Sequence, residues 1–262
     1  MLDLGLSGKT FLISGGSSGI GQATAARLAA EGARVALAAR GRDRLEAAGE
    51  ELRQQHGAEV LTVPADVSTA DGTRAFVEAA LDRFGAIDGL LNNAGSSAAM
   101  AFEKVTDEQW QADLDLKLFA AIRLTRLCLP QLRQRQGAIV NVLAISGKQP
   151  GARSVPTSVT RAAGMALMKA LSKELAQEQV RVNAVCIGAV RSGQHDPEWQ
   201  REHAHMSRDE FYADMAQKRA IPMGRVGNPE EVADLIAFLL SERAAYITGV
   251  AVNFDGGTAA VP

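Results

Sequence analysis

Residues 14–21 read Ser-Gly-Gly-Ser-Ser-Gly-Ile-Gly and lie between a short apolar run and a segment of helical period. A glycine-rich turn that leads from a strand into a helix suits a pyrophosphate group. Gly15 permits the tight turn, Gly19 lets the backbone approach the phosphates, and Gly21 lets the helix pack on the strand. The helix N-terminus adds free N–H groups and the positive end of its dipole. Similar turns also occur without a ligand, so the rest of the chain must decide between the two interpretations.

Short apolar runs alternate with longer helical segments along most of the chain. This alternation predicts an α/β fold in which a parallel sheet is covered by helices on both faces. Right-handed crossovers place the first strand centrally and the ligand crevice at the carboxyl ends of the strands. We therefore expect one domain over residues 1–262 with a doubly wound sheet of the Rossmann type. The predicted strands are Lys9–Ser14, Arg34–Ala38, Glu59–Val63, Ile87–Leu91, Ala138–Val142, Arg181–Val185 and Val250–Asn253, and the predicted helices are Ser18–Ala30, Asp43–Gln55, Asp107–Arg133 and Val155–Gln177.

Composition and charge exclude several classes of function. Apolar residues make up 47% of the chain, enough for a large core, and the net charge of −2 provides no basic surface for nucleic acid. No apolar run reaches the ~20 residues that span a bilayer, and the first residues lack the pattern of a secretion signal. Cys128 and Cys186 stand in apolar contexts without metal-type spacing, which predicts two buried thiols. These features favour a cytoplasmic protein that acts on a small molecule without a metal, a membrane or nucleic acid.

Three later motifs support the ligand-binding interpretation of the glycine turn. Asp66-Val67 ends the third predicted strand, Asn92-Asn93-Ala94-Gly95 ends the fourth, and Asn253-Phe254-Asp255-Gly256-Gly257 follows the last. Together with the glycine turn, these motifs resemble the short-chain dehydrogenase/reductase family from Ser14 to Gly257. The resemblance implies a nicotinamide dinucleotide, with Asp66 at the adenine. The contacts it implies for this cofactor are Gly15, Ser17, Ser18, Gly19, Ile20, Gly21, Asp66, Val67, Asn93, Ala94 and Gly95.

The end of the second strand distinguishes the two nicotinamide cofactors. A carboxylate there would bind the ribose hydroxyls of NAD and repel a 2′-phosphate. The position holds Ala39, followed by Arg40, with Arg42 close enough to assist. A planar, permanently charged guanidinium suits a phosphate. The alternative is that Arg40 is a solvated charge that stacks on the adenine. The sequence thus favours NADP(H) over NAD(H).

The loop that would seat the nicotinamide departs from the family pattern. Family members usually have Pro-Gly after the sixth strand, whereas this chain has Cys186-Ile187-Gly188. Ile187 lacks the fixed φ of proline. We still expect Gly188, Val190 and Ser192 to lie at the carboxamide, and Arg161 to contact the cofactor as well.

The segment that carries catalysis in this family lacks the usual side chains. The family's Ser, the Tyr thirteen residues later and the Lys four further fall on Ala144, Thr157 and Arg161, and the helical Asn falls on Lys117. A methyl group cannot orient a carbonyl, and an aliphatic hydroxyl is a far weaker acid than a phenol with a pKa of about 10. Arg161 stays protonated and can hold a ribose hydroxyl or an oxyanion, whereas burial beside a cation can lower the pKa of Lys117.

These replacements leave more than one function open. The first is an NADP(H)-dependent oxidoreductase that acts on a carbonyl or alcohol through Lys117, Thr157 and Arg161. The second is a cofactor-binding sensor, scaffold or inactive partner subunit, in which Lys117 reaches solvent and Arg161 only binds cofactor. A third keeps the fold for a dehydration or isomerisation.

Two long helices and one charged segment bear on assembly and on substrate access. Leu114, Leu118 and Ala121 share a face of the predicted helix Asp107–Arg133. The segment His195–Arg219 follows a strand end and is placed like the family's mobile substrate-covering helices. The resemblance implies that the two long helices pair in a homodimer or homotetramer. A second apolar stripe, whose spacing is typical of a core face, consists of Ala163, Ala166, Leu167 and Ala170.

Overall fold

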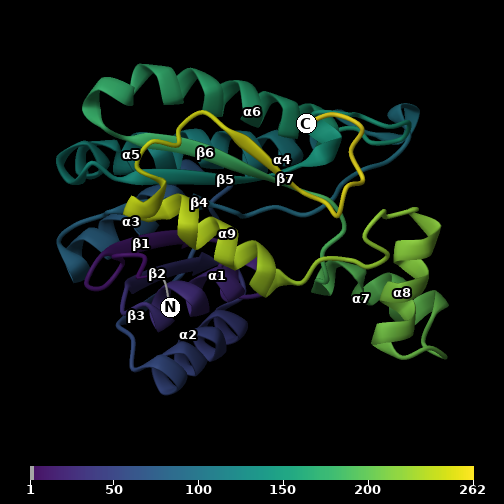
Figure 1. Cartoon of the computed structure of the whole chain (residues 1–262), viewed down its shortest axis with the longest axis horizontal. Helices are drawn as coiled ribbons and strands as arrows, with labels where there is room; N and C mark the ends of the chain where they lie inside the picture. The colour runs from purple at the N-terminus through teal and green to yellow at the C-terminus, as the bar shows by residue number, and fades with distance from the viewer. Residues whose placement is uncertain (1–2) are drawn as a thin grey trace.

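A single parallel sheet carries all seven strands that the computed structural model describes, and the described residues are 3–262. The strand order is β3-β2-β1-β4-β5-β6-β7, which confirms the doubly wound α/β fold (Figure 1). The first strand is interior, as expected, but β4 is the middle strand. The chain reverses direction across the sheet between β1 and β4, where such folds bind their ligands. The strands are β1 (Thr10–Ser14), β2 (Arg34–Ala39), β3 (Val60–Pro64), β4 (Gly89–Asn92), β5 (Ala138–Ala144), β6 (Arg181–Ile187) and β7 (Ala251–Phe254).

Helices cover both faces because successive strand side chains point to opposite sides. In β1, Phe11 and Ile13 join one hydrophobic core while Leu12 joins the other. The first core lies under α1 (Gly19–Ala30), α2 (Arg42–His56) and α9 (Pro229–Leu240). The second lies under α3 (Ala70–Phe84), α5 (Ala120–Arg135) and α6 (Thr157–Glu174). Cys128 and Cys186 are buried free thiols in the second core, which confirms that prediction.

The helix predicted over Asp107–Arg133 is interrupted. It consists of α4 (Asp107–Leu114), the five-residue π-helical segment η2 (Asp115–Phe119) and α5. A π turn is wider than an α turn and often lies at a functional site. Here it carries the buried Lys117.

Helix α6 buries a different face from the one that its alanine spacing predicts. Arg161, Gly164 and Met168 are buried, whereas Ala166 and Ala170 are exposed. The prediction that the alanine stripe packs in the core is therefore wrong for the single chain. The sheet is covered instead by the side of the helix that carries Arg161.

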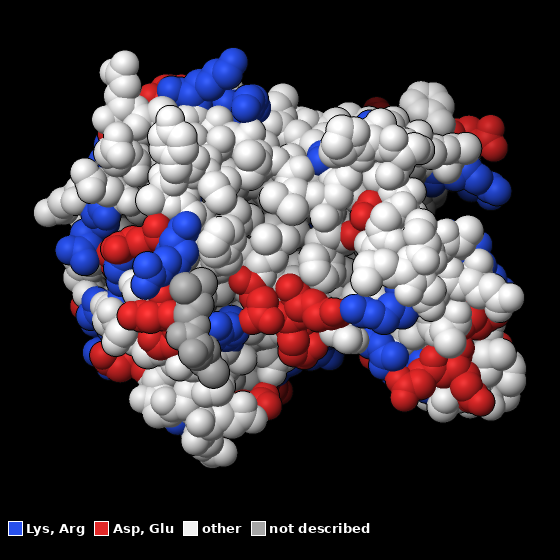
Figure 2. Space-filling view, in the orientation of Figure 1, with Lys and Arg blue, Asp and Glu red and all other residues white. Residues whose placement is uncertain are grey.

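The segment His195–Arg219 forms two helices that stand beside the layered body in Figure 1, α7 (Asp196–Glu202) and α8 (Arg208–Lys218). Phe211, Tyr212 and Met215 pack in a small cluster of their own. Acidic and basic side chains are interspersed on the face shown in Figure 2, with no continuous basic area. None of the helices in residues 3–262 has the length and apolar character that a membrane crossing requires.

Candidate active site and cofactor cleft

The glycine turn between β1 and α1 has the geometry of a phosphate cradle. Gly15 and Gly19 adopt φ angles of 72° and 56°, in the left-handed region that favours glycine. A Cβ atom on Gly21 would lie 2.2 Å from the Gly15 carbonyl oxygen, so only glycine fits there. Ser18 makes no side-chain capping bond, and the first turn of α1 contains no acidic residue. The first N–H groups of α1 thus have no side-chain cap, as an anionic pyrophosphate requires.

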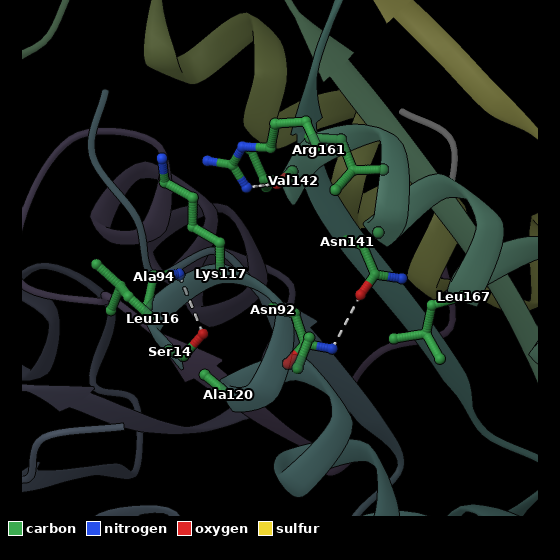
Figure 3. Close-up of a pocket in the computed structure, with 13 residues that line it drawn as sticks. Ser14, Asn92, Ala94, Leu116, Lys117, Ala120, Asn141, Val142, Arg161 and Leu167 are labelled. Carbon is green, nitrogen blue, oxygen red and sulfur yellow. Dashed lines mark hydrogen bonds between the residues drawn. The ribbon is translucent and has the colours of Figure 1, made fainter. Parts of the chain in front are cut away.

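Two motifs about 80 residues apart in sequence are hydrogen-bonded to each other at the glycine turn. The Asn93 side-chain amide donates hydrogen bonds to the carbonyl oxygens of Ser14 and Gly15 at 3.1 and 3.0 Å. Ser14 Oγ accepts from the backbone N–H groups of Asn93 and Ala94 at 3.0 and 3.1 Å, and Figure 3 shows the bond from Ala94. The Asn93 side chain therefore fixes the shape of the glycine turn, a role that the sequence did not reveal.

The ends of β2 and β3 bring a carboxylate and arginines together. Asp66 Oδ1 accepts from the backbone N–H and the hydroxyl of Ser68 at 3.0 and 2.7 Å. Burial would raise the pKa of Asp66, but these bonds and the charge of Arg40 outweigh it and hold that pKa below its usual range. Arg40 is exposed directly after β2, Arg42 begins α2, and Val67 is buried. A cation therefore lies close to Asp66 at the end of β2.

The loop after β6 packs on the motif that follows β7. The backbone N–H of Gly188 donates to the Phe254 carbonyl at 2.9 Å. A Cβ atom on Gly188 would lie 2.8 Å from the Cβ of Asp255, so the close approach requires glycine. Val190 is 5% exposed and packs in the core beside Phe254. The loop is thus fixed by these contacts, although it lacks the proline that is usual in the family that the sequence resembles.

The structure brings together three of the four residues at the predicted catalytic positions. Lys117 lies in η2, Thr157 begins α6, and Arg161 lies one turn further. Their exposed fractions are 6%, 8% and 8%. Lys117 Nζ lies 3.0 Å from Thr157 Oγ1. Ala144, at the end of β5, contributes no polar side-chain atom.

Asp113 is the member of this cluster that the sequence did not predict. Its Oδ1 forms an ion pair with Lys117 Nζ, and the two side chains are 3% and 1% exposed. Its Oδ2 accepts from the Thr160 hydroxyl at 2.7 Å. The expectation that Lys117 reaches solvent is therefore wrong. An Asp–Lys pair four residues apart was the available signal, but on a helix this spacing is typical of an exposed ion pair.

The Thr157 hydroxyl is held with its hydrogen available. Its oxygen accepts from Lys117 Nζ at 3.0 Å and from the backbone N–H of Ala98 at 2.9 Å. A hydroxyl has two acceptor sites and one hydrogen to donate. Because both acceptor sites are taken, Thr157 can act towards a further group only as a donor. Within residues 3–262 the Thr157 hydroxyl donates no hydrogen bond.

The Arg161 side chain extends from α6 towards Lys117 of η2, as Figure 3 shows. Its Nη1 donates to the Val142 carbonyl at 2.7 Å, while its buried Nε has no partner within the described chain. Burial lowers the pKa of Arg161 to about 10, so it stays protonated at neutral pH. Burial also lowers the pKa of Lys117; the hydrogen bond to Asp113 opposes this effect, and the charge of Arg161 adds to it. A Cβ atom on Gly95 would lie 2.9 Å from Arg161 Nη2, so a larger residue there would displace this guanidinium.

The segment His195–Arg219 is anchored to the loop after β6, and Gln194, which directly precedes it, contacts the loop after β4. Tyr212 of α8 exchanges hydrogen bonds with the backbone of Ser192, accepting its N–H and donating to its carbonyl at 3.1 Å each. The Gln194 side-chain oxygen accepts from the backbone N–H of Ser97 at 3.0 Å. Ser97 precedes Ala98, which binds Thr157. Gln194 therefore joins the loop after β6 to the loop after β4 beside the cluster.

A protein-family model described as Enoyl-(Acyl carrier protein) reductase matches residues 15–259. The 3-oxoacyl-acyl-carrier-protein reductase of Thermotoga maritima is 34% identical over 96% of this chain and 98% of its own length. The reductase of the same name from Staphylococcus aureus is 32% identical over 95% of this chain and 97% of its own length.

Two solved structures resemble the chain over nearly its whole length. One is an NADPH-bound short-chain oxidoreductase of Pseudomonas aeruginosa, described as containing an atypical catalytic center, with a TM-score of 0.92, 39% identity and 98% and 99% of the two chains covered. The other is the L-sorbose reductase of Gluconobacter frateurii in complex with NADPH and L-sorbose, with a TM-score of 0.94, 36% identity and 100% of both chains covered. With the parallel sheet and the phosphate cradle, these similarities show that the chain belongs to the short-chain dehydrogenase/reductase family of oxidoreductases.

Proposed function

We propose that this chain is an NADP(H)-dependent oxidoreductase that interconverts a carbonyl and an alcohol. Lys117, Thr157 and Arg161 stand at the positions of the family's Asn, Tyr and Lys, and Ala144 stands at that of its Ser. The observation that carries the proposal is the Thr157 hydroxyl, whose acceptor sites are filled by Lys117 and Ala98. Its hydrogen is left for an acceptor outside the described chain, as a substrate oxygen would be.

The proposed proton path runs from Lys117 through Thr157 to the substrate. NADPH, when bound, would supply the hydride to the carbonyl carbon. As negative charge develops on the substrate oxygen, Thr157 donates its hydrogen to that oxygen and accepts one from Lys117. A free alkoxide on Thr157, which would be very unstable, never has to form. In alcohol oxidation each proton moves in the opposite direction.

Arg161 contributes charge rather than a proton. It remains protonated, and the Val142 carbonyl holds one of its nitrogens. Its other nitrogens can bind a ribose hydroxyl of the cofactor. Preorganised positive charge also stabilises an oxyanion. The two cations thereby replace the hydrogen bond that Ala144 cannot make.

The preference for NADP(H) rests on Arg40. It is exposed at the end of β2, where Ala39 provides no carboxylate to bind ribose hydroxyls or to repel a 2′-phosphate. The two similar solved structures described above contain NADPH. The pyrophosphate would lie on the uncapped N-terminus of α1, with Asp66 at the adenine.

The apolar surface of the helical layer supports a homodimer or homotetramer. Phe119 and Val159 are 39% and 46% exposed. The neighbouring Ala166 and Ala170 are exposed as well. A second copy of the chain would cover this surface.

The substrates of similar reductases provide a panel of compounds with which the proposed function can be tested. Reductases of 3-oxoacyl groups and of L-sorbose are similar along the whole chain. We therefore expect NADPH oxidation, followed as absorbance, with a member of a panel of 3-oxoacyl thioesters, ketoses and simple ketones. If NADPH binds tightly and no member is reduced, the alternative of a cofactor-binding sensor, scaffold or inactive partner subunit is favoured.

A further inference from the structure

Asp113 joins two elements of the site through one buried carboxylate. Asp113 lies in the last turn of α4 and is only 5% exposed. One oxygen pairs with Lys117 of η2, and the other accepts from Thr160 of α6 at 2.7 Å. Thr160 lies between Thr157 and Arg161 in sequence. The carboxylate therefore holds the π-helical segment and the start of α6 in a fixed relation.

The charges of the cluster require this carboxylate. Lys117 and Arg161 are both buried, and a buried cation without a partner is costly. The charged groups that face Lys117 are Asp113 from α4 and Arg161 from α6. Strands β4 and β5 contribute no charged residue, and the Cys186 thiol of β6 faces Arg161. Asp113 is thus the anion that faces both cations.

The same contact determines where the Lys117 ammonium points. A lysine side chain has many rotamers, and its ammonium has three donors. Asp113 and Thr157 take two of these donors from different elements. With Asp113 removed, Lys117 would keep only the neutral Thr157 oxygen and the repulsion of Arg161. The 3.0 Å contact between Lys117 Nζ and Thr157 Oγ1 would then no longer be enforced.

We propose that Asp113 is a positioning residue, which holds the Lys117 ammonium against the Thr157 hydroxyl and balances the two buried cations. The catalytic part of this role rests on the proposed function. The electrostatic part does not rest on it, so the effect of Asp113 on Lys117 can be measured with no substrate present.

The first test is the titration of Lys117 by NMR in protein labelled with ¹³C-lysine, with the signal assigned from Lys117→Met. Replacing Asp113 with Asn removes the charge and keeps the shape. We expect the Lys117 midpoint to fall by about one pH unit or more, since an opposite charge in contact shifts a pKa by roughly 1–3 units. Asp115→Asn is the matched control, because Asp115 pairs with Arg123 in partial contact with solvent. A midpoint shift in Asp113→Asn no larger than that in the control would overturn the proposal.

A stability cycle keeps the proposal testable if Asp113→Asn folds poorly. That variant leaves two buried cations unbalanced, whereas Asp113→Asn combined with Lys117→Met removes one of them. We expect the double variant to unfold at a higher temperature than Asp113→Asn alone. A double variant that is no more stable than Asp113→Asn, or that also fails to fold, would contradict the balancing role.

The pH dependence of kcat/KM in Asp113→Asn separates this proposal from the proposed function. If Lys117 is the proton donor in reduction, activity falls as pH rises through its pKa. In Asp113→Asn this limb of the kcat/KM profile should move to lower pH by the shift that NMR records. If the NMR midpoint shifts and the rate profile does not, Asp113 still positions Lys117 but Lys117 is not the acid. If neither moves, Asp113 has no such role.

Discussion

The Thr157 hydroxyl oxygen lies 3.0 Å from Lys117 Nζ and 2.9 Å from the backbone nitrogen of Ala98. Two donors thus point at one aliphatic hydroxyl and orient its hydrogen away from both. A tyrosine would itself be the acid at this position, whereas the proposed relay takes its proton from the lysine behind the hydroxyl. The proposed relay therefore depends on both residues.

The rate of carbonyl reduction should fall as pH rises, because Lys117 must be protonated to supply the proton. Burial and Arg161 lower the pKa of Lys117 from its ordinary value of 10.5, so this limb should begin below that pH. Lys117→Met should remove the limb and reduce turnover by about 10²–10⁴-fold, the usual range for general acid catalysis. The check is kcat/KM for reduction as a function of pH. Turnover of Lys117→Met within about twofold of the unaltered protein would contradict the assignment.

Arg40→Asp should weaken NADPH binding and reverse or remove its preference over NADH. The cause is the loss of a charged partner for the 2′-phosphate and the gain of a carboxylate that repels it. A charge-assisted hydrogen bond of about 1.5–3 kcal/mol corresponds to a loss of roughly ten- to hundredfold in affinity. Titration calorimetry with both cofactors measures this, with Arg83→Asp as the control, because Arg83 lies at the far end of α3 and pairs with Glu59 before β3. Equal affinities for NADPH and NADH in the unaltered protein would refute the preference.

Much of the fold could be predicted from the sequence because apolar runs and the glycine turn are local signals. The buried pairing of Asp113 with Lys117 could not, since a pair at this spacing is more typical of a helix surface. The π-helical segment that buries Lys117 has no residue signature of its own. The exposure of Ala166 also escaped prediction, because a helical stripe does not show whether its own core or a second copy covers it.

Ala166→Arg on the exposed face of α6 should convert the proposed oligomer into smaller species. A long charged side chain cannot be buried between two copies without a partner. Sedimentation velocity measures the change, and Ala47→Arg, on the exposed face of α2, should leave assembly intact. A stable monomer of the unaltered protein would contradict the proposed homodimer or homotetramer.

Glu231 should stabilise the fold above its unfolded pKa and lose that effect on acidification. Hydrogen bonds from Arg225 and from the Asn228 backbone lower the pKa of Glu231 from 4.5 to about 2. A depressed carboxyl pKa means that the stabilisation is complete above 4.5 and disappears as pH falls towards 2. The difference in melting temperature between the unaltered protein and Glu231→Gln should therefore shrink across this window. Glu230→Gln is the control, and a difference that does not depend on pH would contradict the linkage.

The relay can also be tested by restoring the family's usual side chains. If Lys117 and Thr157 already transfer the proton, the unaltered chain should be active without the three substitutions Ala144→Ser, Thr157→Tyr and Arg161→Lys. Absorbance assays of NADPH oxidation compare this triple variant with the unaltered chain on the same panel. Activity in the triple variant alone would indicate a framework that binds cofactor without chemistry of its own.

The most direct measurement is the rate of hydride transfer from NADPH to a carbonyl substrate in Thr157→Val, with Thr157→Ser as the matched control. Valine keeps the shape of threonine without its hydroxyl, whereas serine keeps the hydroxyl. The account predicts that Thr157→Val loses about 10²–10⁴-fold in rate at unchanged NADPH affinity, while Thr157→Ser stays within about tenfold. Equal rates in the Val and Ser variants would contradict it.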